Sequence, residues 1–114
     1  MIDAALTAPA NAEDFGLPAA AITALRSVLS QYPQIAQALV YGSRAKGNYR
    51  SGSDIDLTLD GPRLTFTEFM HIETALDDLM LPWKIDLSML SHIDNPHLLD
   101  HIARVGKPLW IKKD

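Results

Sequence analysis

The segment DIDLTLD, residues 54–60, alternates polar and apolar side chains without a break. Successive side chains of a β-strand point to opposite faces, so this period of two predicts a strand with one polar and one apolar face. The segment KIDLSML, residues 84–90, has the same alternation. Together they indicate a sheet whose apolar face is covered by helices and whose polar face is open to solvent or to a ligand.

The first half of the chain supplies a helix and a further strand. A helix is predicted to start near Pro18 and to end before Pro33, with apolar residues on one face between them. The nearly continuous apolar segment IAQALVY, residues 35–41, is typical of a strand buried on both sides. The polar, glycine-rich segment 42–53 then predicts a loop.

The second half of the chain contains two more helices and a short strand. Thr65 and Glu68 have the spacing of a capping box at the start of an amphipathic helix, which Pro82 ends. Asn95-Pro96 predicts the start of a last short helix. The residues LWI, 109–111, are expected to add a short edge strand.

This order of elements predicts an α/β (α+β) fold: a small mixed β-sheet with helices packed on one face. With 114 residues, the chain has the length of one compact domain, residues 1–114. Residues 1–16 have no clear period, and we expect them to be a loosely ordered lead-in.

Composition restricts the kind of function. The net charge of −4 argues against direct binding of nucleic acid, which requires a basic surface, so any phosphate binding must be local. The absence of cysteine excludes disulfides and thiolate metal sites. No signal peptide and no apolar run of about 20 residues is present, and we therefore expect a cytoplasmic protein without a membrane segment.

Three aspartates are expected on the open polar face. Asp54 and Asp56 are two residues apart in one strand, so their carboxylates point the same way. Asp86 has the same parity in the second alternating strand and joins them if the two strands are neighbours. Crowded carboxylates repel one another and need a cation, and hard oxygen ligands of this kind select Mg²⁺ or a similar ion.

A candidate phosphate-binding turn lies just upstream of these aspartates. The strand 35–41 runs into Gly42-Ser43, where a following short helix would expose backbone N–H groups that suit a phosphate. Ser43 adds a hydroxyl, and Arg44 and Lys46 add local positive charge. An anion-binding turn beside a carboxylate cluster is the arrangement of a metal–triphosphate site.

Each feature also has an ordinary structural interpretation. Glycine and serine at a strand end are usually a turn, and an Asp-x-Asp on an amphipathic strand is usually a solvated face. His97 and His101 have a spacing that can bind zinc, but no third ligand is evident, and surface or capping roles are the simpler interpretation. The combined pattern of turn, paired aspartates and third aspartate favours function.

The segment YGSRAKGNYRSGSDIDLTL, residues 41–59, closely resembles the signature of the nucleotidyltransferase superfamily that includes DNA polymerase beta and kanamycin nucleotidyltransferase. The length of the chain and its KIDLSML segment are similar to those of the minimal nucleotidyltransferase (MNT) subfamily. The resemblance spans roughly residues 20–112 and implies a polymerase beta-like fold.

The resemblance also implies roles for individual residues. Gly42 and Ser43 match the positions that hold the triphosphate, and Asp54 and Asp56 match those that bind two Mg²⁺ ions during catalysis. Asp86 matches the third aspartate, which helps the metal that activates the acceptor hydroxyl. The implied reaction is an in-line attack on the α-phosphate of ATP or another nucleoside triphosphate, with pyrophosphate leaving.

The resemblance further implies a partner. MNT proteins commonly act as antitoxins beside a helical HEPN-domain toxin, and members of the family transfer AMP from ATP to a tyrosine of that toxin. Two alternatives stay open: a non-catalytic antitoxin that binds nucleotide and covers its partner sterically, and nucleotidyl transfer to a small molecule.

Overall fold

The computed structural model describes residues 15–113, so the predicted loose lead-in lies outside this part except for its last two residues. Of those two, Phe15 is buried, and the folded region therefore begins earlier than expected. None of the helices within residues 15–113 combines the length and hydropathy of a membrane-spanning segment. The elements are α2 (Ala19–Leu29), β1 (Gln37–Tyr41), α3 (Gly42–Lys46), β2 (Ile55–Asp60), α4 (Phe66–Asp77), β3 (Ile85–Met89), the 3-10 helix η1 (Leu90–His92), α5 (Pro96–Val105) and β4 (Lys107–Ile111).

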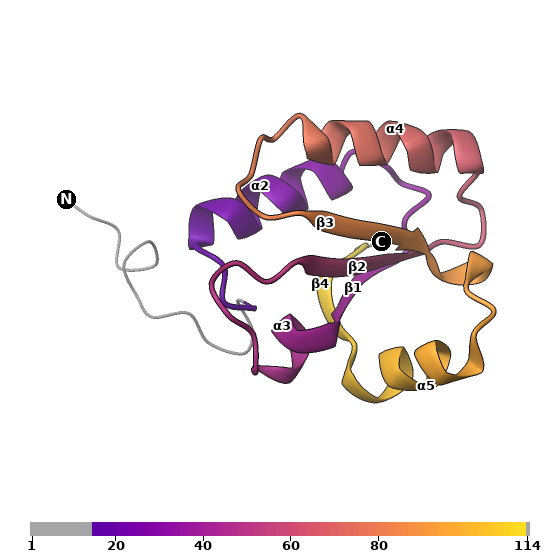
Figure 1. Ribbon diagram of the computed structural model, residues 1–114. Helices are drawn as coiled ribbons and strands as arrows, with labels where there is room; N and C mark the ends of the chain where they lie inside the picture. Colours follow the sequence, from indigo (N-terminus) through magenta and orange to yellow (C-terminus); the bar gives the residue numbers. More distant parts are fainter. Residues whose placement is uncertain (1–14, 114) are drawn as a thin grey trace.

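The four strands form one mixed sheet in the order β3-β2-β1-β4. β1 is antiparallel to β2 and to β4, whereas β2 and β3 are parallel. The chain connects the two parallel strands through α4, as a crossover between parallel strands requires (Figure 1). The predicted α+β class with a small mixed sheet and the edge position of the last strand are both confirmed.

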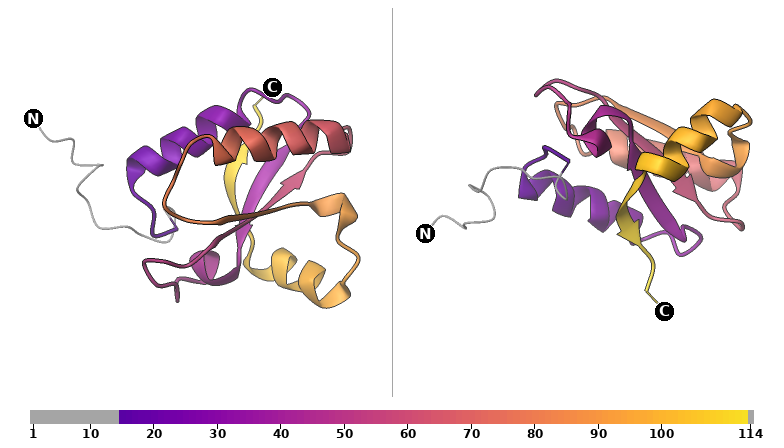
Figure 2. Two further views of the ribbon diagram at one scale, coloured as in Figure 1. Left: turned by 45° about the horizontal axis from the view of Figure 1, so that its top comes forward. Right: turned by 90° about the horizontal axis from the view of Figure 1, so that it is seen from below.

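The apolar face of the sheet carries the core. α2 and α4 lie side by side across this face (Figures 1 and 2). Ile55, Leu57 and Leu59, the apolar set of the alternating strand β2, are all at most 1% exposed beneath them. The alternation in the sequence thus identified the buried face correctly, and burial of this set is the main driving force for the layer.

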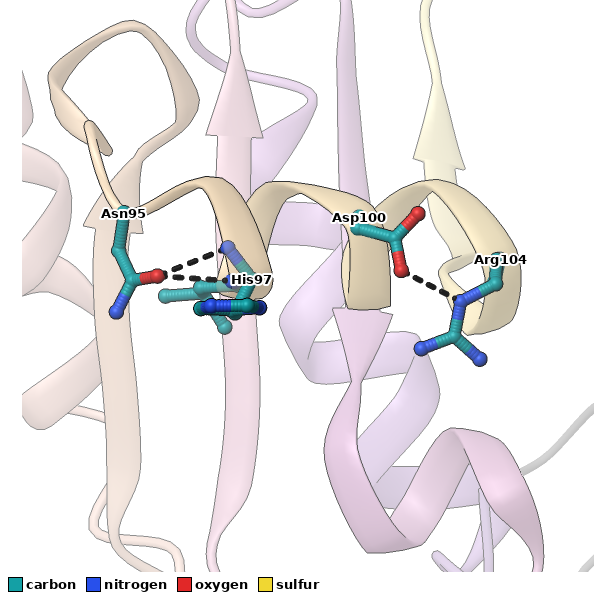
Figure 3. Close-up of polar contacts among 5 residues, drawn as sticks. Asn95, His97, Asp100 and Arg104 are labelled. Atoms are coloured by element: carbon teal, nitrogen blue, oxygen red, sulfur yellow. Dashed lines mark hydrogen bonds and ion pairs between the residues drawn. The ribbon is translucent and has the colours of Figure 1, made fainter.

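The starts of α4 and α5 follow the predicted capping signals. Thr65 and Glu68 form the reciprocal capping box of α4, with bonds of 2.8 and 3.1 Å between each side chain and the other residue's backbone N–H. Asn95 caps α5 and accepts hydrogen bonds from the backbone N–H groups of His97 and Leu98 (Figure 3). Both helices therefore begin where the sequence predicts.

The position of α5 differs from the expectation that helices pack on one face only. α5 and α3 lie on the side of the sheet opposite to α2 and α4 (Figures 1 and 2). α5 packs against β1 and α3, with Ile102 4% exposed. An amphipathic helix must bury its apolar stripe, and the end of β1 offers α5 the surface to do so. The polar face is consequently exposed at Asp86 and partly exposed at Asp56, whereas Thr58 on the same face of β2 is buried and the face is covered beside β1.

Candidate active site

The strand register brings two of the predicted aspartates together. Asp56 in β2 is the direct partner of Asp86 in β3, and Tyr41 in β1 is the partner of Asp56 on its other side. Directly paired residues point to the same face, so these three side chains form one row across three strands. Asp54 is exposed, one residue before β2, and lies close enough for its negative charge to raise the pKa of Asp56.

The carboxylates in this row repel one another. Partial burial raises the pKa of Asp56, the negative charges of Asp86 and Asp54 raise it further, and His101 opposes them. Burial also raises the pKa of Tyr41, a hydrogen bond with Ser88 lowers it, and Asp56 and Asp86 add to the increase. The row therefore carries an excess of negative charge, which a bound cation would neutralise.

The residues fit a divalent cation that also binds a substrate phosphate. Within residues 15–113, no three carboxylate or imidazole groups are gathered closely enough to enclose a metal ion by themselves. Mg²⁺ is typically held by one or two protein carboxylates, with water and substrate phosphates completing its coordination. Asp56 and Asp86, paired on an open face with Asp54 beside them, are a donor set of that kind.

The Gly42-Ser43 turn lies against Asp56. β1 ends at Tyr41 and α3 begins at once with Gly42, which has a φ of 71°. A β-carbon built at position 42 would overlap Oδ2 of Asp56, so only glycine permits this approach. The predicted phosphate-binding turn and the predicted metal ligands are thus neighbours. At the other end of α3, Lys46 is exposed.

Arg44 does not lie where a phosphate ligand would. Its side chain is 1% exposed, and its guanidinium donates to the backbone carbonyls of Phe15 (2.9 Å), Ser51 (3.2 Å) and Ser53 (3.0 and 2.9 Å). Burial lowers the pKa of Arg44, and Tyr49 opposes that effect. The donors of Arg44 are directed at these carbonyls, so its side chain stabilises the segment that leads into Asp54. The predicted contact of Arg44 with the nucleotide is therefore replaced by a structural role.

Two aromatic side chains complete this support. The guanidinium of Arg44 lies 5.3 Å from the ring centre of Tyr49 and 5.7 Å from that of Trp83, distances typical of cation–π contacts. Trp83 also donates its indole N–H to Ser51 at 2.8 Å. Tyr49 lies so close to Gly16 that no β-carbon fits there. The segment between the turn and the aspartates is therefore fixed from several sides.

His101 has a different role from the surface, capping or zinc-binding roles that its spacing suggests. Its Nε2 lies 3.1 Å from the backbone nitrogen of Gly42, whose N–H it accepts, and its ring is edge-on to Tyr41. His97 is exposed near the start of α5 (Figure 3), and the two histidines do not form part of a metal site within the described residues. The spacing of the two histidines could not predict the contact between His101 and Gly42, because these residues are 59 positions apart in the sequence.

The chain matches a known protein family. The sequence model described as "Polymerase beta, Nucleotidyltransferase" matches residues 23–114. This range contains the Gly42-Ser43 turn and the three aspartates. No curated protein matches the chain.

Several solved structures are similar to this one. A toxin–antitoxin structure with AMP-PNP matches with a TM-score of 0.64 at 20% identity, covering 81% of this chain and 74% of the other. The complex of a tri-AMPylated Shewanella oneidensis HEPN toxin with an MNT antitoxin matches with a TM-score of 0.60 at 18% identity, covering 82% and 71%. A putative nucleotidyltransferase from Sulfolobus solfataricus matches with a TM-score of 0.54 at 16% identity, covering 98% and 91%. At these identities the likeness establishes the fold.

Proposed function

The chain belongs to the polymerase beta nucleotidyltransferase family, and we propose that it transfers AMP from ATP to a hydroxyl of a protein partner. The contact between Gly42 and Asp56 is the observation that carries this proposal. It brings the turn suited to a triphosphate next to the carboxylates suited to a metal ion. A site for nucleotidyl transfer needs both in contact, whereas a turn and a solvated strand face without function do not.

The aspartates and the turn are proposed to bind different groups, the metal ion and the triphosphate. Asp54, Asp56 and Asp86 would hold the divalent metal, for which we propose Mg²⁺, and Asp56 and Asp86 contribute directly paired carboxylates. When bound, the metal neutralises triphosphate charge and lowers the pKa of the attacking hydroxyl. The Gly42-Ser43 turn would bind phosphate oxygens through the backbone N–H and the hydroxyl of Ser43, because the N–H of Gly42 is already bonded to His101.

Two cations near the turn have different roles. Lys46 is exposed at the end of α3 and supplies a positive charge for the outer phosphates. Arg44 is buried and supports the segment before Asp54 through the carbonyl of Ser53. We therefore assign nucleotide contact to Lys46 and assign a structural role to Arg44.

The acceptor is proposed to be a tyrosine of a HEPN-domain toxin, with this chain as the antitoxin. Asp86 is exposed and Asp56 is partly exposed, so a hydroxyl presented by a partner protein can reach these carboxylates. The proposal is supported by the similar MNT antitoxin that is bound to a tri-AMPylated HEPN toxin, and by the similar toxin–antitoxin structure that contains AMP-PNP.

The test is transfer between purified proteins. The chain, the proposed HEPN-domain partner, ATP and Mg²⁺ are incubated, and intact-mass spectrometry measures AMP on each protein. We expect AMP on the partner with the wild type, none with Asp54→Ala, and an unchanged yield with Asp78→Ala, which removes an exposed carboxylate at the end of α4. If Asp54→Ala still binds and neutralises the toxin fully while no AMP appears with either protein, a steric antitoxin replaces the enzyme.

A further inference from the structure

α5 brings an imidazole to the turn that is proposed to bind the triphosphate. Nε2 of His101 accepts the backbone N–H of Gly42 at 3.1 Å. The ring meets Tyr41 edge-on, with centroids 6.2 Å apart and an interplanar angle of 80°. His101 therefore contacts the last residue of β1 and the first residue of α3 at once, from an element 59 residues further along the chain.

The position of His101 is fixed by the helix that carries it. The neighbouring residue Ile102 is buried and anchors α5 to the rest of the domain. Asn95 caps the first turn, and the exposed ion pair between Asp100 and Arg104 links successive turns on the outer side (Figure 3). The imidazole is thus presented to the turn by an anchored element.

The contact matters because of the backbone that it fixes. Gly42 has a φ of 71° and no side chain, so its peptide group has more freedom to rotate than that of any other residue type. The neighbouring carboxylate of Asp56 leaves no room for a side chain that could restrict it. The hydrogen bond to His101 supplies the missing restraint. To accept it, Nε2 must be unprotonated, so a neutral ring carries its proton on Nδ1.

We propose that His101 is a positioning residue for nucleotide binding, which holds the peptide group of Gly42 so that the Gly42-Ser43 turn is preorganised against Asp56. This inference rests on the proposed function, because it assigns the purpose of the contact to the triphosphate. Preorganisation of this kind strengthens binding by removing the cost of ordering the turn when the ligand arrives.

Two other interpretations predict different results. If His101 is only a packing residue, any side chain of similar volume replaces it. If it occupies the Gly42 N–H in place of a phosphate oxygen, it competes with ATP, and its removal strengthens binding. The positioning interpretation instead requires a hydrogen-bond acceptor at position 101. A side chain of similar volume without an acceptor should not replace His101, and removal of the acceptor should weaken ATP binding.

The test uses three variants with different acceptors. His101→Gln places an acceptor oxygen near the position of Nε2, His101→Leu fills similar space without an acceptor, and His97→Leu changes the exposed histidine of the same helix. Hydrogen exchange of the Gly42 amide is followed by NMR on the ligand-free protein. ATP affinity with Mg²⁺ is measured by calorimetry on the same samples.

We expect His101→Leu to lose the protection of the Gly42 amide and to weaken ATP binding by about three- to tenfold, the range for one neutral hydrogen bond. His101→Gln should restore both values close to those of the wild type, and His97→Leu should change neither. Tighter ATP binding by His101→Leu, equal behaviour of the Leu and Gln variants, or an unchanged affinity despite a lost amide protection would each overturn the inference. Wild-type protein that binds no ATP with Mg²⁺ would instead reject the proposed function, and with it the role of His101 in binding.

Discussion

Gly42, the first residue of α3, contacts Asp56 in β2, and the carboxylate of Asp56 occupies the space that a β-carbon at position 42 would need. The glycine is therefore required by the aspartate as well as by its own φ of 71°. A substitution at position 42 displaces the proposed metal ligand, and the two halves of the site cannot vary independently.

Gly42→Ala should lower the rate of AMP transfer by about a hundredfold, since a displacement near 1 Å at a reacting centre has an effect of that size. Gly47→Ala is the matched control: Gly47 also has a positive φ, of 87°, but a β-carbon added there would meet no atom within 4 Å. Both variants should lose about 1–2 kcal/mol of stability from the left-handed backbone. Steady-state kinetics and urea unfolding measure the two effects, and equal loss of activity in both variants would contradict the specific contact.

Arg44→Ala should destabilise the domain by about 3 kcal/mol or more, because three backbone carbonyls lose the donors of a buried guanidinium. Arg44→Lys should recover only part of this loss, since one ammonium group lacks the planar fork of donors. Arg50→Ala, at an exposed arginine of the same segment, should change stability by no more than about 0.5 kcal/mol. Chemical denaturation of the three variants decides, and a small effect of Arg44→Ala would reject its structural role.

The sequence alone was sufficient for features that depend on local periodicity. The alternation around Asp56 identified the polar face of β2, and the spacing of Thr65 and Glu68 identified the start of α4. Both signals are carried by residues within a few positions of one another. The shared parity of Asp56 and Asp86 was also visible, but their direct pairing depends on the parallel register of two strands, which no local pattern specifies.

The features that the sequence did not predict depend on long-range contacts. The guanidinium of Arg44 is buried because the carbonyl of Phe15, 29 residues away, lies beside it. His101 reaches Gly42 only because α5 packs on the side of the sheet opposite to α2 and α4. An amphipathic pattern shows that a helix has a face to bury, and it does not show which surface of the sheet will cover that face.

Tyr41→Phe should make the protein more resistant to alkaline unfolding. Burial raises the pKa of the Tyr41 phenol above its ordinary value of 10.0, so the folded state keeps a proton that the unfolded chain releases. The resulting stability is complete below pH 10 and is lost as the pH rises through the folded-state pKa. The melting temperature of the wild type should therefore fall more steeply than that of Tyr41→Phe above pH 10. Parallel slopes for the two proteins would show that the phenol is not perturbed.

Asp56→Asn should stabilise the metal-free protein at neutral pH. The pKa of Asp56 is raised above its ordinary value of 3.8 by burial and by Asp86 and Asp54, so its ionised form is disfavoured in the folded state. The resulting destabilisation is absent below pH 3.8 and develops as the pH rises through the folded-state pKa. In EDTA at pH 7, the variant should melt a few degrees above the wild type, and the difference should vanish near pH 3. A lower melting temperature at pH 7 would identify a structural aspartate.

ATP binding should depend on a divalent ion, because the row formed by Asp56 and Asp86 repels a free polyphosphate in a chain whose net charge is already −4. Calorimetry should give an affinity at least about tenfold higher with Mg²⁺ than with EDTA, a difference of about 1.4 kcal/mol.

Asp86→Asn keeps the shape of the side chain and removes one carboxylate, so it should reduce this dependence of ATP binding on Mg²⁺ while making ATP binding in EDTA somewhat stronger. Asp78→Asn removes an exposed charge at the end of α4 and should leave both affinities unchanged. The opposite changes expected for Asp86→Asn in the two conditions separate a lost metal ligand from a general loss of charge, which would strengthen ATP binding in both. Equal affinity of the wild type with Mg²⁺ and with EDTA would reject the metal site itself.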